Sequence, residues 1–122
     1  MKYEFIISET GRRGAELTVD GIGDITIFKK RITRHDAVKF DEVTAQISKR
    51  IQAAAKKMVA AKGEAKKKYA DELFDANAEI ICHRVDGITP EQLAAADTAD
   101  ILEIAAVSVK LYEDTFDAKK NG

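Results

Sequence analysis

Residues 82–97 read CHRVDGITPEQLAAAD and contain the only cysteine and the only proline of this chain. Gly87 is the residue type that most easily adopts the left-handed conformation found after a helix end. Thr89 offers a hydroxyl N-cap, Pro90 suits the first helical position, and Gln92 completes a capping box three residues after the cap. The stretch therefore predicts the end of one helix and the start of another.

Helical patterns continue on both sides of this joint. Residues 40–62 repeat apolar side chains at steps of three and four, which predicts one long helix with a narrow apolar stripe. Residues 64–84 resume the pattern, and the sequence leaves open whether Gly63 forms a hairpin or a bend. After the joint, Asp97 and Asp100 mark the start of a final helix. One side of that helix carries Ile101, Ile104, Ala105, Ser108, Tyr112 and Phe116.

The first 34 residues have the pattern of short strands. The runs YEFIIS, AELTVD and DITIFKKRIT are separated by TGRRG and DGIGD, whose glycines permit tight turns. We expect an α+β fold, with a small N-terminal antiparallel β-meander followed by a mainly helical portion of three to four helices. The length of 122 residues predicts a single domain. It divides into a β-rich part (1–34), a helical part (35–117) and a flexible tail (118–122).

Composition limits the classes of function. The net charge of −1 predicts no bulk attraction to nucleic acid or membrane. No stretch approaches the about 20 apolar residues of a membrane span. The N-terminal apolar run is short and interrupted by Glu4, unlike that of a signal peptide. We expect a cytoplasmic protein without a membrane partner.

The sequence offers little for catalysis or metal binding. Cys82 and His83 have only the distant His35 as a further ligand type, and no second cysteine or paired-histidine motif is present. We expect Cys82 to be a small apolar group on the buried side of a helix end. The DGIGD turn lacks the third glycine and following helix of a phosphate-binding loop. We therefore predict no enzyme, no catalytic residue, no cofactor and no metal.

Charge is distributed in blocks. Residues 49–68 carry eight basic side chains and one acidic one, whereas residues 69–122 carry four basic and twelve acidic ones. The basic segments suggest phosphate contacts as an alternative function, either in nucleic-acid binding or in regulation. The acidic final third and the few aromatics available to stack on bases argue against nucleic acid. The candidate phosphate-binding residues are Lys29, Lys30, Arg31, Lys56, Lys57, Lys66, Lys67 and Lys68.

Residues 76–116, ANAEIICHRVDGITPEQLAAADTADILEIAAVSVKLYEDTF, resemble the carboxy-terminal half of small tail assembly chaperones of long-tailed bacteriophages. In that family an apolar helix ends in a hydrophobic, small-residue and Asp-Gly segment, followed by a short helix and a last helix. The positions that carry the resemblance are Ile80, Ile81, Cys82, Val85, Asp86, Gly87, Leu93, Asp97 and Ile101.

The resemblance implies a noncatalytic protein of the host cytoplasm that binds the tape measure protein, or another tail protein, during tail building. Leu102 and Val109 widen the apolar arc of the last helix, so they are candidates to contact the partner, with packing on the β-meander as the alternative. The full candidate set is Ile101, Leu102, Val109, Tyr112 and Phe116. A homo-oligomer, or a structural tail or head-tail joining subunit, remains a further interpretation.

Overall fold

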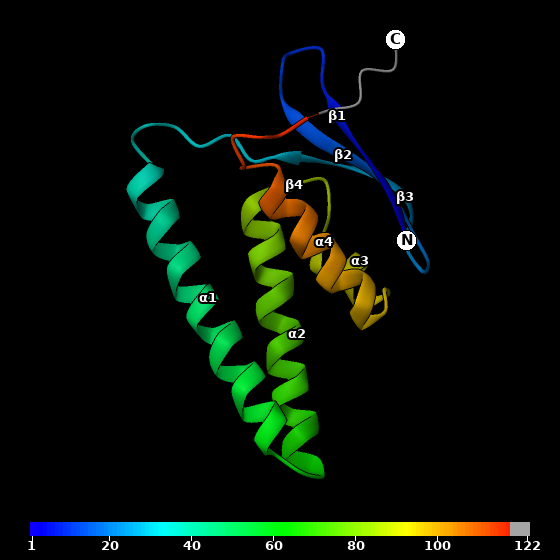
Figure 1. Cartoon of the computed structure of the whole chain (residues 1–122), viewed down its shortest axis with the longest axis vertical. Coiled ribbons are helices and arrows are strands. Elements are labelled where there is room, and N and C mark those ends of the chain that lie inside the picture. The colour runs from blue at the N-terminus through cyan, green and yellow to red at the C-terminus, as the bar shows by residue number, and fades with distance from the viewer. Residues whose placement is uncertain (118–122) are drawn as a thin grey trace. The chain divides into compact units, whose positions relative to one another are not determined.

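The computed structural model describes residues 1–117, and the predicted flexible tail, 118–122, lies outside these residues. Figure 1 shows the sheet and helices of the predicted α+β class, which is confirmed. The elements in chain order are β1 (Lys2–Ile7), β2 (Arg13–Val19), β3 (Gly23–Lys29), α1 (Ala37–Ala60), α2 (Glu64–Arg84), β4 (Val85–Asp86), α3 (Pro90–Ala94) and α4 (Thr98–Lys110).

The chain forms two compact units. The sheet unit consists of residues 1–30 and the described residues from 81 onward, and the hairpin unit consists of residues 31–80. The sheet unit therefore contains all four strands together with α3 and α4, while the hairpin unit contains α1 and most of α2.

The sheet has the strand order β1-β2-β3-β4 and is antiparallel throughout. Along β2, Ala15, Leu17 and Val19 are buried, whereas Glu16 and Thr18 are exposed. This alternation follows from the period of two in a strand, which directs neighbouring side chains to opposite faces. The three strands of the predicted meander are confirmed. Ile27 of β3 is buried like the three β2 residues, whereas no residue of β1 is fully buried.

A fourth strand follows α2 directly and was not predicted. Val85 pairs with Lys29, and Asp86 pairs with Phe28. Gly87 has a φ of 104°, and a Cβ atom at this position would collide with the carbonyl oxygen of Thr26. The interpretation of Gly87 as the residue after a helix end is wrong, because α2 ends at Arg84 and β4 lies between them. The positive φ instead lets the chain leave β4 close to β3.

The joint after Gly87 has the predicted capping box. The Thr89 hydroxyl accepts a hydrogen bond from the Gln92 backbone amide at 3.2 Å, and the Gln92 side chain accepts one from the Thr89 amide at 2.9 Å. Asp97 caps α4 in turn, because its carboxylate accepts from the Asp100 amide at 2.8 Å. The final helix ends at Lys110, earlier than the predicted helical part, and turns follow it.

The hairpin unit answers the question about Gly63. Ala61 is extended and Gly63 has a φ of 63°, so the helix is interrupted there. Figure 1 shows α1 and α2 side by side and joined at one end. The Arg50 guanidinium lies 2.8 Å from the Glu79 carboxylate, and the Lys57 ammonium lies 5.7 Å from the centre of the Tyr69 ring. These contacts show that the two helices are antiparallel.

Candidate functional site

The predicted partner-binding residues divide between the core and the surface. Ile101 is only 3% exposed and lies on the buried side of α4. Leu102 and Val109 are 51% and 40% exposed. Because these two residues are seven positions apart, they lie two turns apart on the same side of the helix. Of the five candidates, these two present the largest apolar surface to solvent.

Tyr112 and Phe116 tie the segment after α4 to the sheet. The Tyr112 hydroxyl donates a 2.6 Å hydrogen bond to the carbonyl oxygen of Arg84, and its ring lies 4.7 Å from the Lys29 ammonium. The Phe116 ring meets the edge of the Phe5 ring, with 5.3 Å between the centroids. Both aromatic side chains are therefore partly occupied by contacts within the sheet unit.

The solvent side of α4 carries a continuous apolar stripe. Ala99 and Ala106 are exposed like Leu102 and Val109, and the four residues follow one another at steps of three, four and three. This spacing aligns their side chains along one line of the helix. We call these four residues the outer stripe. It lies opposite the buried residues Ile101, Ile104, Val107, Ser108 and Leu111.

The charges near the outer stripe are mainly negative. Glu103 follows Leu102, and Glu113 lies four residues after Val109. Asp97 stands at the beginning of the helix, while the nearby cation Lys110 contacts Tyr3, with its ammonium 3.4 Å from the phenol oxygen. At the carbonyl end of α4 the Arg13 guanidinium donates hydrogen bonds to the carbonyl oxygens of Leu111 and Glu113, which offsets the partial negative charge of that end and leaves Asp97 and Glu103 as the acidic groups. The stripe is therefore an apolar surface with acidic borders.

Two exposed side chains on β1 were missed by the sequence reasoning. Tyr3 is 37% exposed and Ile7 is 53% exposed, and β1 forms one edge of the sheet. The ring of Tyr3 meets the edge of the Phe5 ring, with 5.4 Å between the centroids. An edge strand has a neighbour on one side only, and the position of β1 at the edge could not be predicted from its residues.

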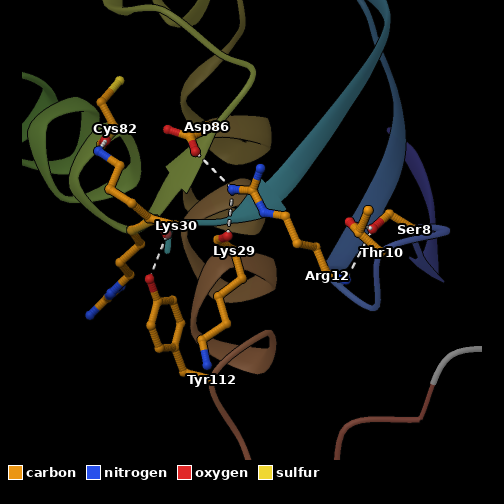
Figure 2. A network of polar contacts seen from close by, with 9 residues as sticks. Ser8, Thr10, Arg12, Lys29, Lys30, Cys82, Asp86 and Tyr112 are labelled. Atoms are coloured by element: carbon orange, nitrogen blue, oxygen red, sulfur yellow. Dashed lines mark hydrogen bonds and ion pairs between the residues drawn. The ribbon is translucent and has the colours of Figure 1, made fainter. Parts of the chain in front are cut away.

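Lys29 and Lys30, two of the candidate phosphate-binding residues, have internal contacts in the sheet unit. The Lys30 ammonium donates a 2.7 Å hydrogen bond to the Cys82 carbonyl in the last turn of α2, where a cation is favourable. Figure 2 shows Arg12 reaching the Lys29 carbonyl and the Asp86 carboxylate, both at 2.8 Å. These contacts link the end of β3 to β4 and to the end of α2. Lys29 and Lys30 are therefore less available to bind a phosphate.

Burial changes the acid–base properties of three groups near these contacts. It raises the pKa of Tyr112 to about 12, so the phenol is neutral at neutral pH, and it lowers the pKa of Arg84. Burial also raises the pKa of the half-buried Cys82 thiol. Its sulfur lies 3.7 Å from the Ile88 carbonyl oxygen. A thiol that is harder to ionise is a poor nucleophile.

The described residues contain no group of three or more His, Cys, Asp or Glu side chains that could hold a metal ion. His83 lies in the last turn of α2 and is half-buried, and His35 is exposed in the segment before α1. The two histidines lie in different units of the chain.

The hairpin unit brings two lysine clusters together at the turn between α1 and α2. Lysines from the end of α1, from the turn and from the first turns of α2 are all exposed. We call this set the lysine tip. It comprises Lys56, Lys57, Lys62, Lys66, Lys67 and Lys68. Arg31, the remaining candidate, is exposed at the start of the hairpin unit, outside this set.

Comparison with known proteins adds no relative. No protein-family model, curated protein or solved structure matches this chain. Within residues 1–117, every helix is too short or too polar to cross a membrane. The outer stripe and the lysine tip are therefore the two candidate functional surfaces of the described residues.

Proposed function

We propose that this chain is a noncatalytic tail assembly chaperone that binds an amphipathic helix of a bacteriophage tape measure protein. The proposal combines the resemblance of residues 76–116 to that family with one structural observation, the outer stripe of α4. Apolar residues at steps of three and four are the pattern that receives a second helix. Soluble helices ordinarily present polar residues on this side.

The size of the stripe favours reversible binding. Leu102 and Val109 already have about half of their surface covered, so covering the rest contributes roughly 1 kcal/mol for each side chain. Ala99 and Ala106 add little area but allow a helix backbone to approach closely. A weak individual contact suits a chaperone that must leave before the tail is finished. Many copies along one long helical protein would together keep its apolar surface covered.

The acidic borders define the kind of helix expected. Glu103 follows Leu102 beside the stripe, and Asp97 is at the beginning of the helix. A partner helix with apolar residues on one side and Lys or Arg on the flanks would complement both features. We therefore expect selective binding of basic amphipathic helices over acidic ones.

The proposal predicts that a long helical protein is encoded beside the gene of this chain. The test is co-expression with that protein, with its soluble fraction as the measurement. We expect the unchanged chain to raise solubility, and Leu102→Lys or Val109→Lys to lose the effect. Val38→Lys is the matched control, because Val38 is 70% exposed and lies in the hairpin unit.

Equal solubility with all variants would contradict the assignment of the outer stripe. Retention of the chain in purified virus particles would contradict a chaperone role and favour a structural tail subunit. No effect of the unchanged chain on the long helical protein would overturn the proposed partner.

A further inference from the structure

We propose that the lysine tip of the hairpin unit binds double-stranded DNA through its phosphates, without reading the base sequence. This inference concerns a different unit from the outer stripe and is independent of the chaperone proposal. The sequence alone separates the lysines into two clusters, and its acidic final third argues against nucleic acid. The hairpin turn joins the two clusters. Asp71, Glu72, Asp75 and Glu79 of the acidic segment follow them on α2 within the hairpin unit, and its carboxylates from residue 81 onward belong to the sheet unit.

Charge is the first argument. Six exposed lysines lie between residues 56 and 68, and Glu64 is the single carboxylate in that segment. The described contacts of the tip include no ion pair that would neutralise these lysines. Glu72 and Asp75 line a pocket together with Lys57, so this lysine is the least available of the six. A dense positive surface attracts the phosphate backbone and releases its counterions.

The shape of the tip is the second argument. A helix with its side chains is about 10–12 Å thick, and the major groove of B-form DNA is about 12 Å wide. The axes of two packed helices are about 8–10 Å apart. The end of the hairpin can therefore enter the groove with its two helices side by side along the direction of the groove. Lys66, Lys67 and Lys68 are consecutive helical residues, so they project in three directions about 100° apart. Such a tip offers cations to the phosphates on both walls of the groove.

Tyr69 gives the lysines partial order. Its half-buried ring lies 5.7 Å from the Lys57 ammonium of α1 and 6.0 Å from the Lys68 ammonium of α2. One ring thus holds cations from both helices at the same end of the hairpin. Restricting these side chains before binding lowers the entropy lost when they meet a phosphate.

The residue types indicate binding that is independent of sequence. Residues 56–69 contain no Arg, Asn or Gln, the side chains that form paired hydrogen bonds with base edges. Lysine is a point charge suited to phosphate. A membrane surface is a poorer match, since Val59 is the only large apolar side chain exposed at the tip, and surface-bound helices bury a wide apolar face. A-form RNA is also a poorer match because its major groove is narrow.

The experiment measures binding of the full chain to a fluorescent 25-base-pair DNA duplex by anisotropy over a series of salt concentrations. We compare Lys66→Gln/Lys67→Gln with Lys39→Gln/Lys49→Gln. The second variant removes the same charge from exposed positions of the same unit, away from the tip. Because all four positions are exposed, circular dichroism should report unchanged helix content for both variants.

Each lost phosphate contact should make the plot of the logarithm of the association constant against the logarithm of the salt concentration shallower by about 0.9. Near 0.1 M salt, this change weakens binding roughly eightfold. We therefore expect the tip variant to bind roughly 60-fold more weakly, with a slope shallower by about 1.8. The control variant should bind within about twofold of the unchanged chain, and affinity should be the same for duplexes of different sequence.

Equal losses for the two variants would overturn the assignment to the tip, because net charge alone would then explain binding. Tighter binding to double-stranded RNA, to phosphatidylserine vesicles or to polyglutamate than to the duplex would overturn the choice of partner. Absence of salt-dependent binding to DNA would overturn the proposal as a whole.

Discussion

Replacing Gly87 with alanine should destabilise the sheet unit far more than the same change at Gly11. Both glycines have a positive φ, 104° and 84° respectively. An alanine with a positive φ is strained by about 1–2 kcal/mol. Alanine also lowers the conformational entropy of the unfolded chain, which offsets about 0.4–1 kcal/mol of this cost. A Cβ atom at Gly11 meets nothing within 4 Å, so Gly11→Ala should cost about 1 kcal/mol.

The additional cost at Gly87 comes from the close approach of β4 to β3. Its added Cβ would collide with the Thr26 carbonyl oxygen, and only a shift of the chain away from β3 relieves that contact. Such a shift weakens the two residue pairs of β3 and β4 and the 2.8 Å ion pair of Arg12 with Asp86. With about 1 kcal/mol for each hydrogen bond affected, we expect a total of about 3 kcal/mol for Gly87→Ala.

Urea denaturation of the two variants measures this difference in the free energy of unfolding, and thermal denaturation provides a second measurement. At about 4 °C for each kcal/mol, thermal midpoints should fall by about 12 °C for Gly87→Ala and about 4 °C for Gly11→Ala. Equal losses at the two positions would show that β4 does not lie as close to β3 as the contact with Thr26 requires.

Three further substitutions test other contacts. Thr89→Ala removes the hydroxyl that accepts a hydrogen bond from the Gln92 backbone amide, and it should lower the free energy of unfolding by about 1 kcal/mol. An unchanged urea midpoint would refute the capping box. Tyr112→Phe removes the hydrogen bond to the Arg84 carbonyl and should cost about 1 kcal/mol at neutral pH. Because the pKa of Tyr112 is raised to about 12 in the folded chain, its neutral form stabilises the fold below about pH 10, and this contribution is lost as the pH rises toward 12. The stability difference between the unchanged chain and Tyr112→Phe should therefore shrink over that range, and a constant difference would contradict the burial of the phenol. Cys82→Ala should lower the unfolding free energy by at most about 1 kcal/mol and leave partner binding intact, whereas a folded variant without binding would reveal a functional thiol.

Local signals in the sequence were sufficient for much of the fold. The alternation in β2 and the Thr89 capping box each depend on neighbouring residues, so they could be predicted. The strand at Val85–Asp86 could not, because its two residues are extended by pairing with Lys29 and Phe28, more than fifty positions away. The end of α4 was also missed, since Tyr112 and Phe116 continue its apolar spacing although they contact the sheet from a turn.

The two candidate surfaces differed in how far sequence could locate them. The exposure of Leu102 and Val109 follows from helix geometry once Ile101 and Ile104 are known to be buried. The lysine tip required the turn at Gly63, which the residues alone left undecided between a hairpin and a bend. Its clusters are separate in the chain and meet only because α1 and α2 are antiparallel.

Hydrogen exchange during titration with a designed basic amphipathic helical peptide tests the central proposal most directly. The account predicts slower exchange in α4, saturable binding, and loss of both effects in Leu102→Lys but not in Val38→Lys. An acidic peptide with the same apolar residues should bind more weakly, because of Asp97 and Glu103. Protection confined to the outer face of the sheet or to the hairpin unit, with α4 unchanged, would contradict the account.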